Sequence, residues 1–270
     1  MENNTQSEVF LPEETPKIRY ALLDEIRGFL VLCMIFYHGF LSVFNVLGLE
    51  VADTLFDFFT PVQPIFAGMF IMLSGMMCGF SHSNIIRGAK CFAVGIVITV
   101  VTSLAPESFG DIAIRFGILH LLGISMMFCG VLNFAFKRIN KWVGIILALA
   151  LFFVLYGLVD KNADFVGITK LIPQSWHQNE YLFPFGITTS GFFSADYFPI
   201  FPWMFLFVAG YFLYKFEIPQ KHSKLFAPKR VKPLGFLGRH ALLIYIVHQP
   251  IIYVFCGFMY LVFFNGMLYG

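Results

Sequence analysis

Apolar stretches of about 20 residues recur along the chain and constrain its fold more than any other feature. A helix needs about 20 such residues to cross the ~30 Å hydrocarbon core of a bilayer. The sequence predicts an all-α, multi-pass membrane bundle with about seven transmembrane helices. The last span is long enough to tilt or to break near Pro250. The predicted spans are residues 22–45, 61–80, 89–105, 116–136, 142–159, 197–215 and 237–264.

Composition excludes other classes of protein. Hydrophobic residues make up 58% of the 270 residues and charged residues 13%, about half the charged share of a soluble domain. Such a chain can neither cover its surface in water nor remain disordered. A net charge of +2 gives no indication of nucleic-acid binding. All five cysteines fall in apolar stretches without metal-binding spacing, so we expect them to be buried and unreactive, and we expect no metal.

The distribution of basic residues predicts the orientation. With the N-terminus in the cytoplasm, all of the 18 Lys and Arg residues except Arg115, Lys161 and Lys170 fall on the cytoplasmic side. The positive-inside rule then gives an N-in, C-out topology, and we expect the protein in a cell membrane. We expect residues 1–20 to form a cytoplasmic tail and residues 21–270 a single transmembrane domain. The polar, aromatic-rich segment 160–196 is expected to fold over the outer face.

The first predicted helix carries ionisable residues at membrane depth, which are costly there and often functional. Arg27 and His38 are eleven residues apart, so they share a helix face at a separation of about 16 Å along the axis. Asp24 precedes Arg27 by three residues and can hold its guanidinium group. Arg27 is alternatively a snorkelling anchor, and His38 alternatively forms only an interhelical hydrogen bond.

Two further histidines lie in predicted spans. His120 follows the start of the fourth span, and His248 lies in the seventh, just before Gln249. Together with His38 they are candidates for one catalytic site in the outer half of the bundle, while packing roles for His120 and His248 are equally open.

Three residues are candidates for binding a substrate at the outer side. Asp196 opens the sixth span, where it either caps that helix or faces an outer site. The other two candidates are Gln249 and Arg115.

Four segments carry a family resemblance: RYALLDEIRGFLVLCMIFYHGF (19–40), IRFGILHLLGI (114–124), DYFPIFPWMFLFVAGYFL (196–213) and LGRHALLIYIVHQPII (237–252). In this order they resemble the bacterial family of heparan-α-glucosaminide N-acetyltransferase catalytic-domain proteins. The Arg27-x10-His38 spacing also resembles the first helix of the acyltransferase 3 family. No histidine occurs in residues 46–60, the region of the catalytic histidine in the eukaryotic enzyme that names the first family, and His38 is the nearest substitute.

The resemblance implies an acyltransferase whose donor is cytoplasmic acetyl-CoA or another acyl-CoA. Arg27, Asp24 and Arg239 would then hold the donor, with its thioester near His38. The histidine would act as a general base or accept the acyl group itself. The acceptor would be an amine or hydroxyl at the outer face, such as that of an amino sugar or another small molecule or glycan.

Competing interpretations come from other classes of protein. A small-molecule or ion transporter also suits intramembrane Arg and His residues and a proline-broken helix, but the sequence contains no evident inverted repeat. A retinal photoreceptor is excluded because the seventh span has no lysine. The expected partners are therefore the lipid bilayer, acyl-CoA and the acceptor, without nucleic acid. A homo-oligomer is compatible with the sequence.

Overall fold

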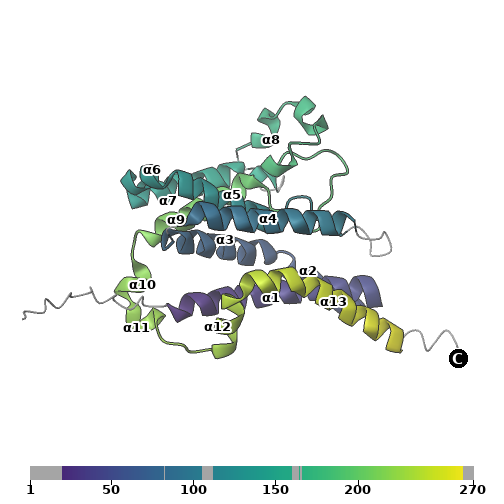
Figure 1. Cartoon of the computed structure of the whole chain (residues 1–270). Helices are drawn as coiled ribbons and strands as arrows, with labels where there is room; N and C mark the ends of the chain where they lie inside the picture. The colour runs from purple at the N-terminus through teal and green to yellow at the C-terminus, as the bar shows by residue number, and fades with distance from the viewer. Residues whose placement is uncertain (1–19, 82, 105–111, 160–163, 165, 264–270) are drawn as a thin grey trace, which may run out of the picture.

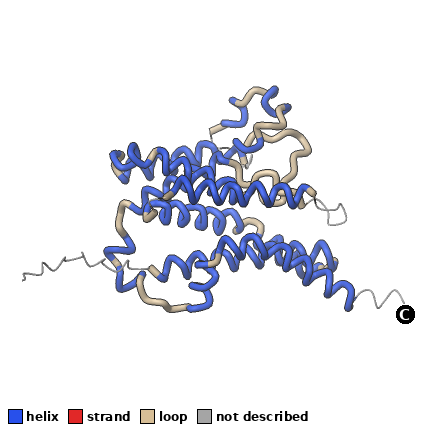
Figure 2. Tube along the Cα trace, viewed as in Figure 1, coloured by secondary structure: helices blue, strands red, loops and turns tan. Residues whose placement is uncertain are grey.

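The computed structural model describes residues 20–81, 83–104, 112–159, 164 and 166–263, and these parts contain helices and loops but no strand (Figures 1 and 2). Each of the seven predicted ranges overlaps one helix of 14 residues or more, so the all-α prediction is confirmed. These helices are α1 (Ala21–Leu47), α3 (Gln63–Gly79), α4 (Asn84–Ser103), α5 (Ile118–Val131), α7 (Lys141–Leu155), α9 (Ile200–Tyr214) and α13 (Ala241–Phe263).

The helices form two layers (Figure 1). In one layer α1 packs against α12 (Lys232–Arg239) and α13, and in the other α3 packs against α9 and α4 against α5. Glycines permit these close approaches, because a Cβ atom on Gly75 would lie 2.0 Å from the Phe207 carbonyl oxygen of α9. The main apolar core lies in the second layer, around the fully buried Leu121, Phe207 and Phe212.

Fewer helices than seven are long enough to cross a bilayer. Four qualify by length and hydropathy, namely α1, α4, α13 and α7 with its following 3-10 turn; α2 (Glu50–Phe59) and α3, bent by 53°, would together make a fifth. In contrast, α5 has 14 residues and α9 has 15, or about 21–23 Å. Most residues of both helices are buried inside the bundle. The chain is thus a membrane protein, and its seven spans stay a prediction.

The break in the last predicted span lies at His240 and not near Pro250, through which α13 continues. The cause is the attachment of α12 to α1. A Cβ atom on Gly238 would lie 1.7 Å from the Asp24 carbonyl oxygen, so the two backbones touch. The buried carboxylate of Glu25 also accepts hydrogen bonds from the backbone N–H groups that precede α12. Because α12 is held along α1, the chain turns at the C-terminal end of α12.

The described residues of the 160–196 segment form α8 (Ile168–Leu171) and 3-10 turns at Gln174–Gln178 and Phe183–Phe185. The position of this segment over the outer face stays a prediction. The Tyr197 hydroxyl donates to the Phe183 carbonyl over 2.6 Å. Hydrogen bonds, first of all from the Thr169 hydroxyl, hold the pKa of Asp164 below its ordinary value.

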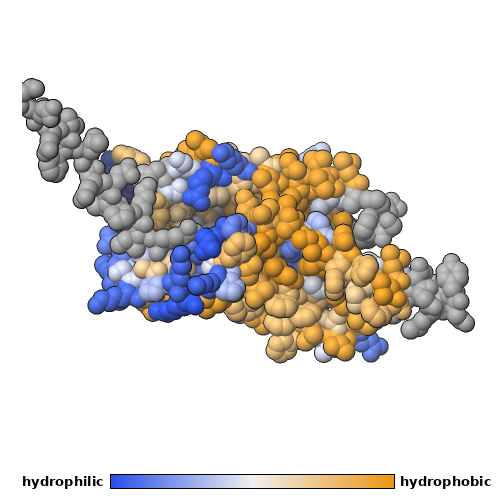
Figure 3. All heavy atoms as spheres, turned by 60° about the horizontal axis from the view of Figure 1, so that its bottom comes forward, coloured by the Kyte–Doolittle hydropathy of each residue, from blue (hydrophilic) through white to orange (hydrophobic). Residues whose placement is uncertain are grey.

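The two ends of the molecule differ in polarity. The short helices α6 (Asn133–Arg138), α10 (Ile218–Lys221) and α11 (Ser223–Phe226) lie at the end where α1 begins, and α8 lies toward the end where α13 finishes (Figure 1). Figure 3 shows hydrophilic residues gathered at the first end and a mostly apolar surface over the rest of that face. This pattern suits a bundle whose flank contacts lipid and whose basic end contacts water.

Candidate functional site

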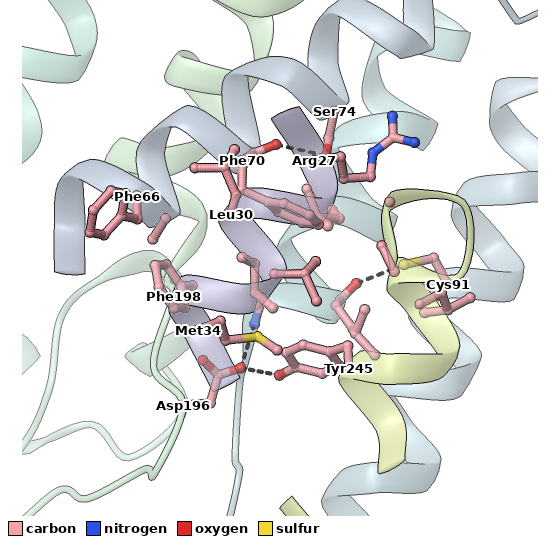
Figure 4. A pocket seen from close by; sticks show the side chains of 18 of the residues that line it. Arg27, Leu30, Met34, Phe66, Phe70, Ser74, Cys91, Asp196, Phe198 and Tyr245 are labelled. Carbon is pink, nitrogen blue, oxygen red and sulfur yellow. Dashed lines mark hydrogen bonds between the residues drawn. The ribbon is translucent and has the colours of Figure 1, made fainter. Parts of the chain in front are cut away.

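A cavity of about 470 Å³ lies between the two layers, and α1, α3, α4, α5 and the α12–α13 corner contribute to its wall. Its middle section is apolar, with Leu30 and Met34 of α1 facing Phe66 and Phe70 of α3 (Figure 4). Polar side chains line it mainly toward its two ends. Figure 4 shows Arg27 on one side of this apolar section and Asp196 with Tyr245 on the opposite side.

Four cationic side chains line one end of the cavity. Arg27 comes from α1, Arg87 and Lys90 from the first turns of α4, and Arg239 from the last turn of α12. The last three are exposed, so the cavity is open to the surface at this end. The expected contact between Arg27 and Asp24 is present at 3.5 Å. This concentration of positive charge suits a ligand with several phosphate groups, which guanidinium groups bind in a bidentate manner.

At the other end, His38 lines the cavity and contacts a second histidine. The rings of His38 and His248 have centroids 5.3 Å apart, and Tyr37 packs edge-on against His38 at 5.5 Å. The structure thus brings together two of the three predicted histidines. It also leaves His38 without a hydrogen bond to any other residue in the described part of the chain, so its ring nitrogens are available to a ligand.

The third histidine, His120, lies apart from this pair. It is 2% exposed and does not line the cavity. Its Nδ1 accepts from the Gly117 backbone N–H at 3.2 Å, and its Nε2 lies 3.3 Å from the Thr99 hydroxyl. That hydroxyl donates to the Ile114 carbonyl, so it accepts from Nε2. Because both ring nitrogens are engaged, the arrangement favours a packing role for His120.

Asp196 joins three segments at the cavity wall. Its carboxylate accepts from the Ile118 backbone N–H at 3.0 Å and from the Tyr245 hydroxyl (Figure 4). The predicted cap of the helix that follows Asp196 is therefore wrong, because the carboxylate caps α5, whose N-terminus lies beside it. The alternative expectation, that Asp196 faces the site, agrees with its position in the cavity wall.

The remaining predicted binding residues lie outside the cavity wall. Arg115 is exposed and lies over the Phe192 ring at 5.7 Å. Gln249 is half-buried on α13, and its side-chain oxygen is buried without a hydrogen-bond partner among the described residues. Their roles in acceptor binding stay predictions.

The structure adds site residues that sequence reasoning missed. Arg87 and Lys90 counted only toward topology, although their i, i+3 spacing put them on one helix face. Tyr245 could have been found in the same way, because it precedes His248 by three residues and so lies on the same helix face.

The cysteines and the carboxylates form no metal centre in the described residues, which contain no group of three His, Cys, Asp or Glu side chains suited to a metal ion. All five cysteines are free. The expectation that all are buried is wrong for Cys33, which is half-buried and lines the cavity together with Cys91. Cys33 is only half-buried because the cavity lies along the face of α1 that carries it.

Comparison with known proteins gives one match. Residues 19–250 match the model of the family described as heparan-alpha-glucosaminide N-acetyltransferase, catalytic. No curated protein and no solved structure matches the chain.

Proposed function

This chain belongs to the heparan-alpha-glucosaminide N-acetyltransferase catalytic family, a family of acetyltransferases, and we propose that it transfers an acetyl group from acetyl-CoA within the membrane. The observation that carries this proposal is the cavity, which joins a cluster of four cations to His38 through an apolar section. A CoA thioester has the same sequence of parts: phosphates, a mostly uncharged pantetheine arm and a reactive carbonyl.

The dimensions of α1 support this assignment of the donor. Arg27 and His38 lie eleven residues apart on this helix, which corresponds to about 16 Å along its axis, roughly the length of a pantetheine arm. With phosphates at Arg27, Arg87, Lys90 and Arg239, the thioester carbon would lie near His38. Another acyl-CoA would use the same phosphate contacts. Selection among acyl groups would therefore occur at the histidine end of the cavity.

The chemistry proposed at His38 is general base catalysis. An unprotonated ring nitrogen takes the proton from an attacking amine, the amine nitrogen bonds to the acyl carbon, and the carbon–sulfur bond breaks. The proton then passes to the CoA thiolate, so the histidine is regenerated. Formation of an acyl-histidine intermediate is the alternative route.

We further propose that the N-terminus and the cationic cluster face the cytoplasm and that the acceptor is bound at the opposite face. The distribution of Lys and Arg residues supports this orientation, since cytoplasmic acyl-CoA then meets the basic end of the cavity. The family suggests an amino sugar of the glucosamine type as the acceptor.

Binding of acetyl-CoA to Arg27 variants tests the donor site. Arg27→Ala should weaken binding about 10- to 150-fold, the effect of one lost hydrogen bond to a charged group. Arg27→Lys should restore part of the affinity, because lysine keeps the charge but loses the planar fork. Isothermal calorimetry on detergent-solubilised protein measures both dissociation constants.

Lys224→Ala is the matched control, because Lys224 is an exposed cation of α11 that does not line the cavity. Equal affinity in all four proteins would contradict the proposed site.

A further inference from the structure

The residue of interest is His248, which lies behind His38 as seen from the cavity. His38 lines the cavity, whereas His248 does not and is 8% exposed. The two rings are in contact, with centroids 5.3 Å apart. His248 is therefore placed to act on a substrate only through His38.

The hydrogen bond of His248 fixes which nitrogen carries its proton. Nδ1 lies 2.7 Å from the carbonyl oxygen of Tyr245, one turn earlier on α13. A carbonyl oxygen only accepts, so Nδ1 holds the hydrogen, and Nε2 of the neutral ring has a free lone pair. That Nε2 is buried and has no hydrogen-bond partner among the described residues.

A buried acceptor without a partner is unfavourable, because its desolvation costs about 1–3 kcal/mol. Such a group in a folded protein therefore calls for an explanation. The neighbouring group able to supply a ring N–H donor is His38. The 5.3 Å between the two ring centroids matches the separation of two imidazoles joined by a hydrogen bond, so a His38 nitrogen turned toward Nε2 of His248 would reach it.

We propose that His248 is a positioning residue that accepts a hydrogen bond from His38 and orients it as the general base, an inference that rests on the proposed transfer function. The His38 nitrogen facing the cavity is then unprotonated and takes the proton of the acceptor amine. The opposite N–H of the resulting imidazolium is held by His248 Nε2. The cavity-side proton leaves to the CoA thiolate when the carbon–sulfur bond breaks, so both rings return to their starting state.

Tyr245 connects this pair to the rest of the site. Its carbonyl accepts from His248, and its hydroxyl donates to Asp196, whose carboxylate also holds the N-terminus of α5. The orientation of His248 is therefore tied to a residue anchored in the opposite layer. Tyr37 also packs edge-on against His38.

Two substitutions of His248 separate orientation from packing. In His248→Asn the amide nitrogen can still donate to the Tyr245 carbonyl, but no acceptor remains near the Nε2 position. In His248→Gln the side-chain oxygen reaches that position and can accept from His38. We expect His248→Asn to lower kcat about 10- to 150-fold, the cost of one hydrogen bond to a charged group, with KM for acetyl-CoA unchanged, and His248→Gln to retain more activity.

An acetyl-transfer assay with glucosamine gives these constants, and nitrogen-15 NMR of histidine-labelled protein tests the pair independently of turnover. We expect His248 to carry its proton on Nδ1, with an Nε2 shift that changes in His38→Ala. Wild-type kcat in folded His248→Asn, equal losses in both variants, or an Nε2 shift indifferent to His38→Ala would overturn the inference. Absence of transfer by the wild type would instead contradict the proposed function, and the NMR result would then decide the pairing alone.

Discussion

His38, His120 and His248 differ in how many of their ring nitrogens have a partner within the described residues. Both nitrogens of His120 are engaged, one nitrogen of His248 is engaged, and neither nitrogen of His38 is. Hydrogen bonding to both nitrogens holds a ring in place, whereas a base needs a free lone pair directed at its substrate. On this ground we propose His38, rather than His120 or His248, as the residue that meets the reacting atoms.

The contrast between His120 and His38 predicts opposite effects of their removal. His120→Ala leaves the Gly117 N–H without its acceptor, and we expect it to lower the stability of the protein by about 1–3 kcal/mol. His38→Ala removes the base, and we expect it to lower the transfer rate about 10²- to 10⁴-fold while the melting temperature stays close to that of the wild type. Thermal unfolding and a radiolabelled acetyl-transfer assay on both proteins measure the two effects. Loss of transfer in a stable, folded His120→Ala protein would contradict the packing role.

Sequence reasoning identified all three histidines from their depth in apolar spans. It favoured His38 through its spacing from Arg27 but left packing and catalytic roles equally open for His120 and His248. Apart from the Thr99 hydroxyl, the partners that distinguish these two are backbone groups, the N–H of Gly117 and the carbonyl of Tyr245. Every residue carries such groups, so the sequence offers no signal for them. The positions of Arg27 and His38 on one face were predictable because they depend only on the period of a single helix.

Among the elements, α1 carries both ends of the proposed site, and its contact with α12 brings Arg239 to the cavity. A Cβ atom on Gly28 would lie 1.9 Å from the Leu234 carbonyl oxygen. We expect Gly28→Ala to push α12 away, to destabilise the protein by about 1–3 kcal/mol, and to weaken acetyl-CoA binding because Arg239 moves.

The matched control is Gly39→Ala on the same helix, where a Cβ atom would meet nothing within 4 Å. That substitution should be neutral or stabilising by up to about 1 kcal/mol, with unchanged affinity for acetyl-CoA. Thermal unfolding and calorimetry distinguish the two variants. Equal behaviour of Gly28→Ala and Gly39→Ala would show that the α1–α12 contact does not position the donor site.

The locations of the elements were predictable, and their ends were less so. Apolar length gives each span, but α5 and α9 are shorter than predicted because they lie inside the bundle. The capping of α5 by Asp196 joins residues 118 and 196. Local capping rules compare residues only a few positions apart, so such a distant cap follows from tertiary packing alone.

For the molecule as a whole, the packing of the two layers determines which cationic side chains line the cavity. The sequence supplied many basic residues on the predicted cytoplasmic side, and four of them line the cavity. Which loop cations converge depends on how α4 and α12 pack beside α1, and this packing is not encoded in any one segment. Under the proposed function, the same arrangement would give the molecule a direction, with phosphates bound at the cationic end and transfer at the histidine end.

Sided transfer in vesicles is the measurement that tests this account most directly. The protein is reconstituted with glucosamine trapped inside, and an impermeant thiol reagent reports the orientation through Ser175→Cys in the α7–α9 connection and Lys224→Cys in α11. Labelled acetyl-CoA, which does not cross the bilayer, is added outside. We expect labelled N-acetylglucosamine within vesicles whose Lys224 face is outward, and none when His38→Ala is used. Product formed only in vesicles whose Ser175 face is outward would contradict it.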